Sequence, residues 1–190
     1  MIKQNKRSIR NHKAIYLFVE GEADKAYFDT LKAELHMPGL KAFDTKGGSG
    51  IKVLEKARSK LKLGNLDEDS EKYLVFDKDA LTQGELQGIL KRAKEEGFGI
   101  GFSNISFEVW LLAHFEKLTK GLLSQKSLEI SLSQHLKQSY KKANQKQLEI
   151  IISKYEAAIN NANVVNKVDF DYQCTTIGTM IEEIRGSSKK

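Results

Sequence analysis

Three acidic residues stand directly after apolar runs, where they could hold a metal ion. Glu20 follows the run at 14–19, and Asp77 and Asp79 follow the run at 73–76. Carboxylates that converge in a partly desolvated site repel one another unless protonation or a divalent cation neutralises them. Oxygen ligands select Mg²⁺ or Mn²⁺ rather than zinc, and Mg²⁺ is commonly held by one or two carboxylates, water and substrate phosphates. An Asp-x-Asp pair is also common in solvated loops, and directly after an apolar run both a solvated loop and a functional site stay open.

A parallel sheet is the element that could bring these acids together. Strands are predicted for the apolar runs at 14–19, 40–43, 73–76 and 99–102. Helices are predicted where apolar residues recur at helical spacing, over 27–35, 53–61 and 86–93. This alternation indicates an α/β fold with a parallel sheet flanked by helices. Sites in such sheets form beyond the carboxyl ends of the strands, so the acids meet if the first and third strands lie close.

The C-terminal third is predicted to be mainly helical. Apolar stripes at helical spacing run over 107–115, 148–159 and 177–184. The segment 127–134 alternates like a strand, yet Leu128, Leu132 and Leu136 also fit a helix, so both interpretations stay open. We expect a basic arm over 1–13, an α/β core over 14–115 and a helical extension over 116–190 packed on that core, together forming a single domain.

Four further features could contribute to a site. Glu108 falls off the apolar stripe of its helix, at the same sheet edge as the other acids, so it is a further candidate acid or a helix cap. His114 shares the apolar stripe, so it is either a hydrogen-bonded core residue or a proton shuttle. The GGSG segment at 47–50 could bind phosphate through its backbone N–H groups or simply form a mobile turn. Lys78 stands between the two aspartates and could balance their charge or touch phosphate.

Composition and charge limit the class of protein. The 190 residues carry a net charge of +6 and one cysteine, Cys174, which excludes an internal disulfide and a thiolate metal cluster. No run of eighteen apolar residues is present and the N-terminal stretch lacks an apolar segment, so we expect a cytoplasmic protein without a membrane span or signal peptide. The positive charge is concentrated at the start of the chain, in Lys3, Lys6, Arg7, Arg10 and Lys13. This arm could bind a nucleic-acid backbone without sequence specificity, or be a solvated tail.

Three motifs together resemble a known family. Strand–Glu–Gly followed after about fifty residues by strand–Asp-x-Asp resembles the Toprim domain of topoisomerases, primases and OLD-family nucleases. More closely, VEGEADKAYF (19–28), VFDKDA (75–80) and SNISFEVWLLAHF (103–115) are similar to the motifs of the RloB-like family of bacterial restriction and abortive-infection loci. Ala23 and Asp24 stand where that family often has Thr-Glu, and Ile105 where it usually has proline.

The resemblance implies a Mg²⁺- or Mn²⁺-dependent nuclease that acts on DNA or RNA in phage defence. It implies Asp77 and Asp79 as metal ligands, Glu20 as general acid/base or ligand to a second metal, and Glu108 as a further acid. A nucleic-acid-sensing or regulatory subunit that works with a separately encoded ATPase is the main alternative, and no Walker A pattern occurs in this chain. Two other classes of enzyme also use Asp-x-Asp. A HAD-like phosphatase has it after the first strand, whereas here it follows the third, and a nucleotide-sugar glycosyltransferase would leave Glu20-Gly21 without a role.

Overall fold

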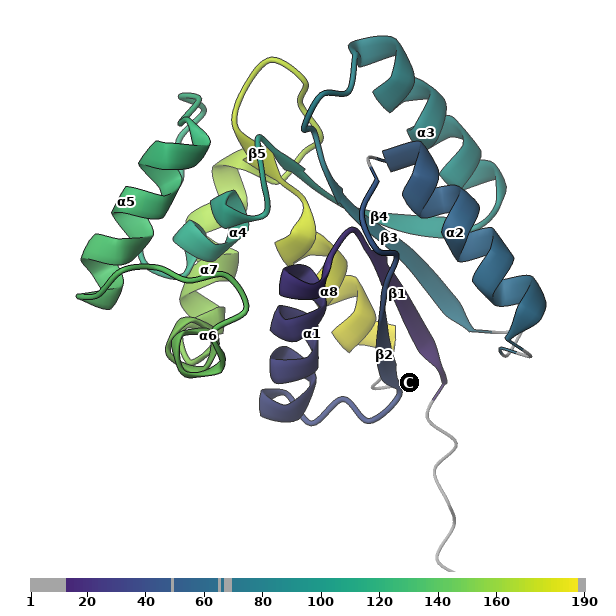
Figure 1. Cartoon of the computed structure of the whole chain (residues 1–190), viewed down its shortest axis with the longest axis horizontal. Helices are drawn as coiled ribbons and strands as arrows, with labels where there is room; N and C mark the ends of the chain where they lie inside the picture. Colours follow the sequence, from purple (N-terminus) through teal and green to yellow (C-terminus); the bar gives the residue numbers. More distant parts are fainter. Residues whose placement is uncertain (1–12, 49, 65, 67–69, 188–190) are drawn as a thin grey trace, which may run out of the picture.

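A five-stranded sheet forms the centre of the part of the chain that the computed structural model describes, residues 13–48, 50–64, 66 and 70–187 (Figure 1). Its strands, in the order β2-β1-β3-β4-β5, are β2 (Leu40–Asp44), β1 (Ile15–Val19), β3 (Glu71–Asp77), β4 (Phe98–Asn104) and β5 (Cys174–Thr175). The first four are parallel, and β5 pairs antiparallel with β4. The predicted α/β class with a largely parallel sheet is confirmed.

The two central strands have the sequences expected of strands covered on both faces. All five residues of β1 are buried, as are residues 73–76 of β3. Burial on both faces requires a continuous apolar run rather than an alternating one. The two runs that carry the acids at their ends are therefore the middle of the core.

Helices cover both faces of the sheet. They are α1 (Glu22–Glu34), α2 (Gly50–Leu63), α3 (Gln83–Glu95) and α8 (Ile177–Ser187). α2 and α3 lie on one face, and α1 and α8 lie on the other (Figure 1). The start of α3 is fixed by a capping box, in which the Thr82 hydroxyl accepts from the Glu85 N–H and the Glu85 carboxylate accepts from the Thr82 N–H.

The direction of the chain reverses between β1 and β3. From β1 the chain moves outward to β2 on one side, and it returns to β3 on the other side of β1. The carboxyl ends of β1 and β3 lie side by side, with Val19 paired to Val75. Such a switch point leaves a crevice between the loops that diverge from it, and Glu20 and Asp77 stand at its edge.

The core ends with α4 (Glu108–Ala113), and the described part of the extension beyond it is mainly helical, apart from loops and the short β5. Besides α8, its helices are α5 (Gln125–Leu136), α6 (Gln145–Ile152), α7 (Tyr155–Ala162) and the 3₁₀ helix η1 (Asn163–Val165). The ambiguous segment 127–134 is part of α5, which buries its leucines along one side. The predicted stripe at 148–159 is divided into two helices, because α6 ends at Ile152 and α7 begins at Tyr155.

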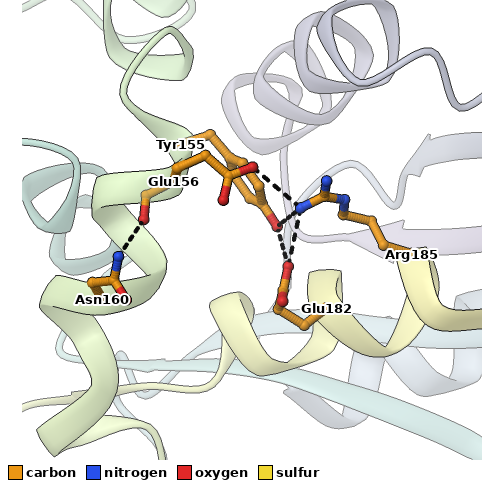
Figure 2. Close-up of polar contacts among 5 residues, drawn as sticks. All are labelled: Tyr155, Glu156, Asn160, Glu182 and Arg185. Carbon is orange, nitrogen blue, oxygen red and sulfur yellow. Dashed lines mark hydrogen bonds and ion pairs between the residues drawn. The ribbon is translucent and has the colours of Figure 1, made fainter.

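A polar cluster ties α7 to α8 (Figure 2). Tyr155 donates a hydrogen bond of 2.8 Å to Glu182, and the Arg185 guanidinium lies 3.2 Å from Glu182 and 3.4 Å from Glu156. Because α8 packs on β4, these contacts fix the extension to the sheet. None of the helices in the described part of the chain has the length and apolarity needed to cross a membrane.

Candidate active site

A cavity of about 390 Å³ lies at the switch point, and it collects acids from four elements. Glu20 follows β1, Glu22 and Asp24 lie in the first turn of α1, Asp77 ends β3 with Asp79 two residues on, and Glu108 begins α4. Four of these six acids, all except Glu22 and Asp24, are the ones predicted from the sequence. The parallel sheet brings them together because the carboxyl ends of its strands share one edge.

Glu20 is an uncompensated acid in this cavity. Burial, followed by the charges of Asp24 and Asp79, raises its pKa from 4.5 to about 8, while the backbone N–H groups of Asp77 and Gly50 partly oppose the rise. Its Oε1 is buried and has no hydrogen-bond partner within the described residues. A buried carboxylate oxygen without a donor is costly, so this atom is available to a cation or a proton.

Asp77 shares that environment and also holds a structural bond. One of its carboxylate oxygens accepts a 2.9 Å hydrogen bond from the Phe107 N–H, at the start of α4. Burial and the charges of Asp24 and Glu20 nevertheless raise the pKa of Asp77 well above its usual value. Asp79 is exposed at the cavity mouth and lies in the left-handed region with φ +38°, a conformation that aspartate tolerates better than most residues.

Asp24 was not among the predicted site residues. Burial and the charge of Glu108 raise its pKa from 3.8 to about 7. A signal was present in the sequence, because Asp24 is the acid of the VEGEADKAYF motif that stands one carbon shorter than the usual glutamate. Its place in the first turn of α1 directs it to the same crevice as Glu20.

Glu108 has a different electrostatic environment. It is almost fully buried, but Lys142 Nζ lies 2.8 Å from its Oε1 and the Tyr140 hydroxyl lies 3.4 Å from the same atom. Burial alone would raise the pKa of Glu108, but the bonds to Lys142 outweigh it and lower this pKa overall. Glu108 is therefore held as a carboxylate with its charge balanced, whereas Glu20 and Asp77 are not.

The loop between α5 and α6 supplies this balancing charge. Tyr140, Lys142 and Ala143 all line the cavity. The side chain of Gln147 fixes the loop, because it accepts from the Lys141 N–H and donates to the Ser139 carbonyl, both at 2.8 Å. No periodic pattern in the sequence marks this polar loop, and only the tertiary structure reveals its place in the site.

Two glycines of the GGSG segment form another wall of the cavity. Gly47 and Gly48 have φ values of +74° and +112°, and a residue with a side chain would be strained in either conformation. The loop is fastened, since Gly47 N–H donates to the Glu20 carbonyl at 2.8 Å and Lys56 Nζ donates to the Gly47 carbonyl at 2.6 Å. Ser49 lies outside the described residues.

His114 is placed behind the cavity rather than on its wall. It is buried, its Nδ1 lies 3.0 Å from the Trp110 carbonyl, and its Nε2 lies 3.2 Å from the Tyr27 hydroxyl, which itself accepts from the Trp110 indole. Burial lowers the pKa of His114 to about 4, so the ring is neutral at pH 7. Both ring nitrogens are occupied, and His114 orients Tyr27, which does line the cavity.

The two predicted basic contacts that the structure describes, Lys78 and Lys13, do not line the cavity. Lys78 Nζ donates to the Phe170 carbonyl at 2.8 Å and lies 4.0 Å from the centre of the Phe170 ring. Lys78 therefore holds the loop before β5 in place. Lys13 lies 3.5 Å from Glu71, at the opposite edge of the sheet from the acids. The other predicted arm residues, Lys3, Lys6, Arg7 and Arg10, lie outside the described residues.

The acids fit a hard divalent cation chemically without forming a closed cage. In the described residues, no three His, Cys, Asp or Glu side chains are arranged as a ready-made metal site. The donors are all oxygens, the carboxylates repel one another, and Glu20 Oε1 lacks a partner. Oxygen donors of this kind suit Mg²⁺, which commonly takes only one or two protein carboxylates and completes its coordination with water and phosphate oxygens.

Comparison with known proteins identifies the family but no individual relative. Searches of the curated proteins and of the solved structures found no match. The family model described as RloB-like protein matches residues 15–184. This match includes every acid of the cavity and the α5–α6 loop that completes its wall. The chain therefore belongs to the RloB-like family.

Proposed function

We propose that the protein is a Mg²⁺- or Mn²⁺-dependent hydrolase of nucleic-acid phosphodiesters. The observation that carries this proposal is the group of acids with raised pKa at the switch point, among which Glu20 Oε1 has no partner. Such a group is stabilised when a divalent cation and a phosphate enter together, because the cation neutralises the acids and the phosphate supplies further oxygen ligands.

The residues divide into metal-holding and proton-handling groups in this scheme. Asp77 and Asp79 would hold the cation, with Glu20 as a further ligand or as the general base. When bound, the cation would polarise the scissile phosphate and lower the pKa of the attacking water. In the metal-free protein, burial and the neighbouring acids raise the pKa of Glu20 to about 8, so that it is mostly protonated at pH 7. A bound cation would favour its ionised form, and that carboxylate could then take a proton from the attacking water.

Glu108 and Lys142 would act as a pair. Lys142 keeps Glu108 ionised, and among the described residues it is the one lysine or arginine that lines the cavity, beside the acids. A phosphate that enters the cavity could therefore accept a charge-assisted hydrogen bond from Lys142 while a cation held by the acids contacts its other oxygens. In this arrangement Glu108 orients the lysine rather than the metal.

Family membership supports a role in bacterial phage defence, within the cytoplasm where phage nucleic acid is copied. The main alternative is a nucleic-acid-sensing subunit whose partner ATPase triggers the response. In that case the same cavity would bind a phosphodiester without cutting it. The two functions differ in whether the purified chain releases cleaved products.

The test is a cleavage assay with plasmid DNA, single-stranded DNA and bulk tRNA in Mg²⁺, Mn²⁺ or EDTA. We expect cutting of at least one substrate with either metal, none in EDTA, and none by the Asp77→Ala, Asp79→Ala double variant. The matched control is Glu34→Gln, Glu95→Gln, which removes two exposed acids away from the cavity. Cutting that persists in the aspartate variant, or no cutting of any substrate by the wild type, would overturn hydrolysis by the isolated chain.

A further inference from the structure

The α5–α6 loop and the start of α6 carry an unusual concentration of positive charge. Residues 137–146, here called the lysine segment, contain Lys137, Lys141, Lys142 and Lys146 and no acid. The nearest acids in the sequence are Glu129 and Glu149. All four lysines are exposed, and Lys142 also reaches the cavity wall. The segment therefore presents three exposed lysines close in sequence to Lys142, which lines the acidic cavity and is paired with Glu108.

The lysine segment is built to keep a fixed shape. The Gln147 side chain bonds to the backbone of Ser139 and Lys141, Tyr140 N–H donates to Ser133 Oγ at 2.9 Å, and Asn144 caps α6 by accepting from the Gln147 N–H. Because its backbone is already fixed, the segment loses little backbone freedom when a ligand binds to its lysines. A merely solvating charge run needs no such bracing.

A second group of lysines flanks another wall of the same cavity. Lys46 and Lys52 are exposed on either side of Gly47 and Gly48, which line the cavity. A chain of phosphates that crosses the cavity mouth would meet positive charge at both ends of its path. The acids in between would repel those phosphates without such flanking charge, because like charges in a partly desolvated site interact strongly.

We infer that the lysine segment is the surface that binds the sugar-phosphate backbone of a nucleic-acid strand and leads it into the cavity. This inference rests on the proposed function and names the route of its substrate. Lys13, the described end of the N-terminal arm, lies at the opposite edge of the sheet, whereas Lys142 of the lysine segment lines the cavity. DNA and RNA share the phosphodiester chemistry that the lysines recognise.

The test is a binding experiment with the full chain in EDTA, where the proposed function allows no turnover. Fluorescence anisotropy with labelled oligo(dT) and oligo(U) of about 15 nucleotides, measured over a range of NaCl concentrations, gives affinity and salt slope. The variant is Lys137→Gln, Lys141→Gln, Lys146→Gln, which leaves the Lys142 contact with Glu108 in place. The matched control is Lys91→Gln, Arg92→Gln, Lys94→Gln, in the last turns of α3.

We expect the lysine-segment variant to reduce the salt slope by about 2 and the affinity on the order of a hundredfold at 0.1 M salt. The α3 control should bind like the wild type, since it removes equal charge at the opposite sheet edge. The relative loss for oligo(dT) and oligo(U) identifies which nucleic acid the surface prefers.

Three results would overturn the inference. One is an unchanged slope in the lysine-segment variant, another is an equal loss in the α3 control, and the third is displacement of the oligonucleotide by poly-glutamate at equal charge, which would indicate an acidic protein partner. The proposed function is judged separately, by hydrolysis of bis(p-nitrophenyl) phosphate by the wild type in Mn²⁺. Absence of that hydrolysis would count against catalysis while the binding result stands.

Discussion

Replacing Glu20 with glutamine should stabilise the metal-free protein at alkaline pH. The folded protein raises the pKa of Glu20 from 4.5 to about 8, mainly by burial. Between these values the unfolded chain releases the proton and the folded chain keeps it, so the folded state binds more protons. The stability that neutral Glu20 contributes is therefore complete below pH 4.5 and is lost as the pH rises through about 8. Glutamine cannot ionise, so the variant escapes this loss.

The pKa values set the size of the effect. The difference between 4.5 and about 8 corresponds to an upper bound of about 5 kcal/mol in the free energy of unfolding. Because Glu20 is only partly buried and water reaches it through the cavity, we expect about 2–4 kcal/mol in favour of the variant at pH 8.5. Asp24 and Asp77 add to the pH dependence of both proteins, so only the difference between them is assigned to Glu20.

Urea unfolding in EDTA at pH 5, 6.5 and 8.5 measures this difference. Trp110 is the one tryptophan of the sequence and is fully buried, so its fluorescence reports unfolding of the core. Glu34→Gln makes the same chemical change at an exposed position of α1 and should follow the wild type. Equal pH dependence of wild type and Glu20→Gln, or a variant less stable than the wild type at pH 8.5, would refute the raised pKa of Glu20.

Three other perturbations give measurable outcomes. Mg²⁺ or Mn²⁺ at a hundred times its Kd should raise the free energy of unfolding at pH 8 by about 3 kcal/mol in urea titrations, and should have little effect on Asp77→Asn, Asp79→Asn. Lys142→Ala should raise the pKa of Glu108, lower the rate of cleavage at pH 7 about tenfold or more, and move the pH–rate profile to higher pH. The Lys142→Arg variant should keep part of the activity, and an unchanged pH–rate profile in Lys142→Ala would contradict the pairing of Lys142 with Glu108. Tyr27→Phe should cost about 1–3 kcal/mol in thermal or urea unfolding, because a buried indole and imidazole lose their shared partner, and unchanged stability would count against that hydrogen-bond chain.

The sequence predicts the acidic half of the site because simple rules connect it to the fold. A short continuous apolar run is typical of a strand covered on both faces, and parallel strands place their carboxyl ends at one edge. Glu20 and Asp77 are therefore close in space once β1 and β3 are neighbours, as the structure confirms. Glu108 follows from the same rule, since its helix begins just beyond β4.

The basic half of the site follows no such rule. Lys142 and Tyr140 lie in a polar loop without apolar periodicity, and their position depends on how α5 and α6 pack beside α1 and α4. The strand β5 is only two residues long and forms because it pairs with β4, so no local pattern marks it. The local sequence pattern also fitted both a helix and a strand over 127–134. This segment is helical in the structure, where the leucines of α5 are buried along one side of the helix.

The wall of the cavity is built from early and late parts of the sequence, so the cavity can be completed only late in synthesis of the chain. Residues 13–115 carry the acids, but the Lys142 ammonium that balances Glu108 emerges from the ribosome later, and α8, which holds α7 against the sheet, emerges later still. A nascent or prematurely terminated chain would thus hold the repelling acids without their counter-charge. For a protein proposed to cut nucleic acid, late assembly would keep the growing chain inert beside the messenger and transfer RNAs that surround it.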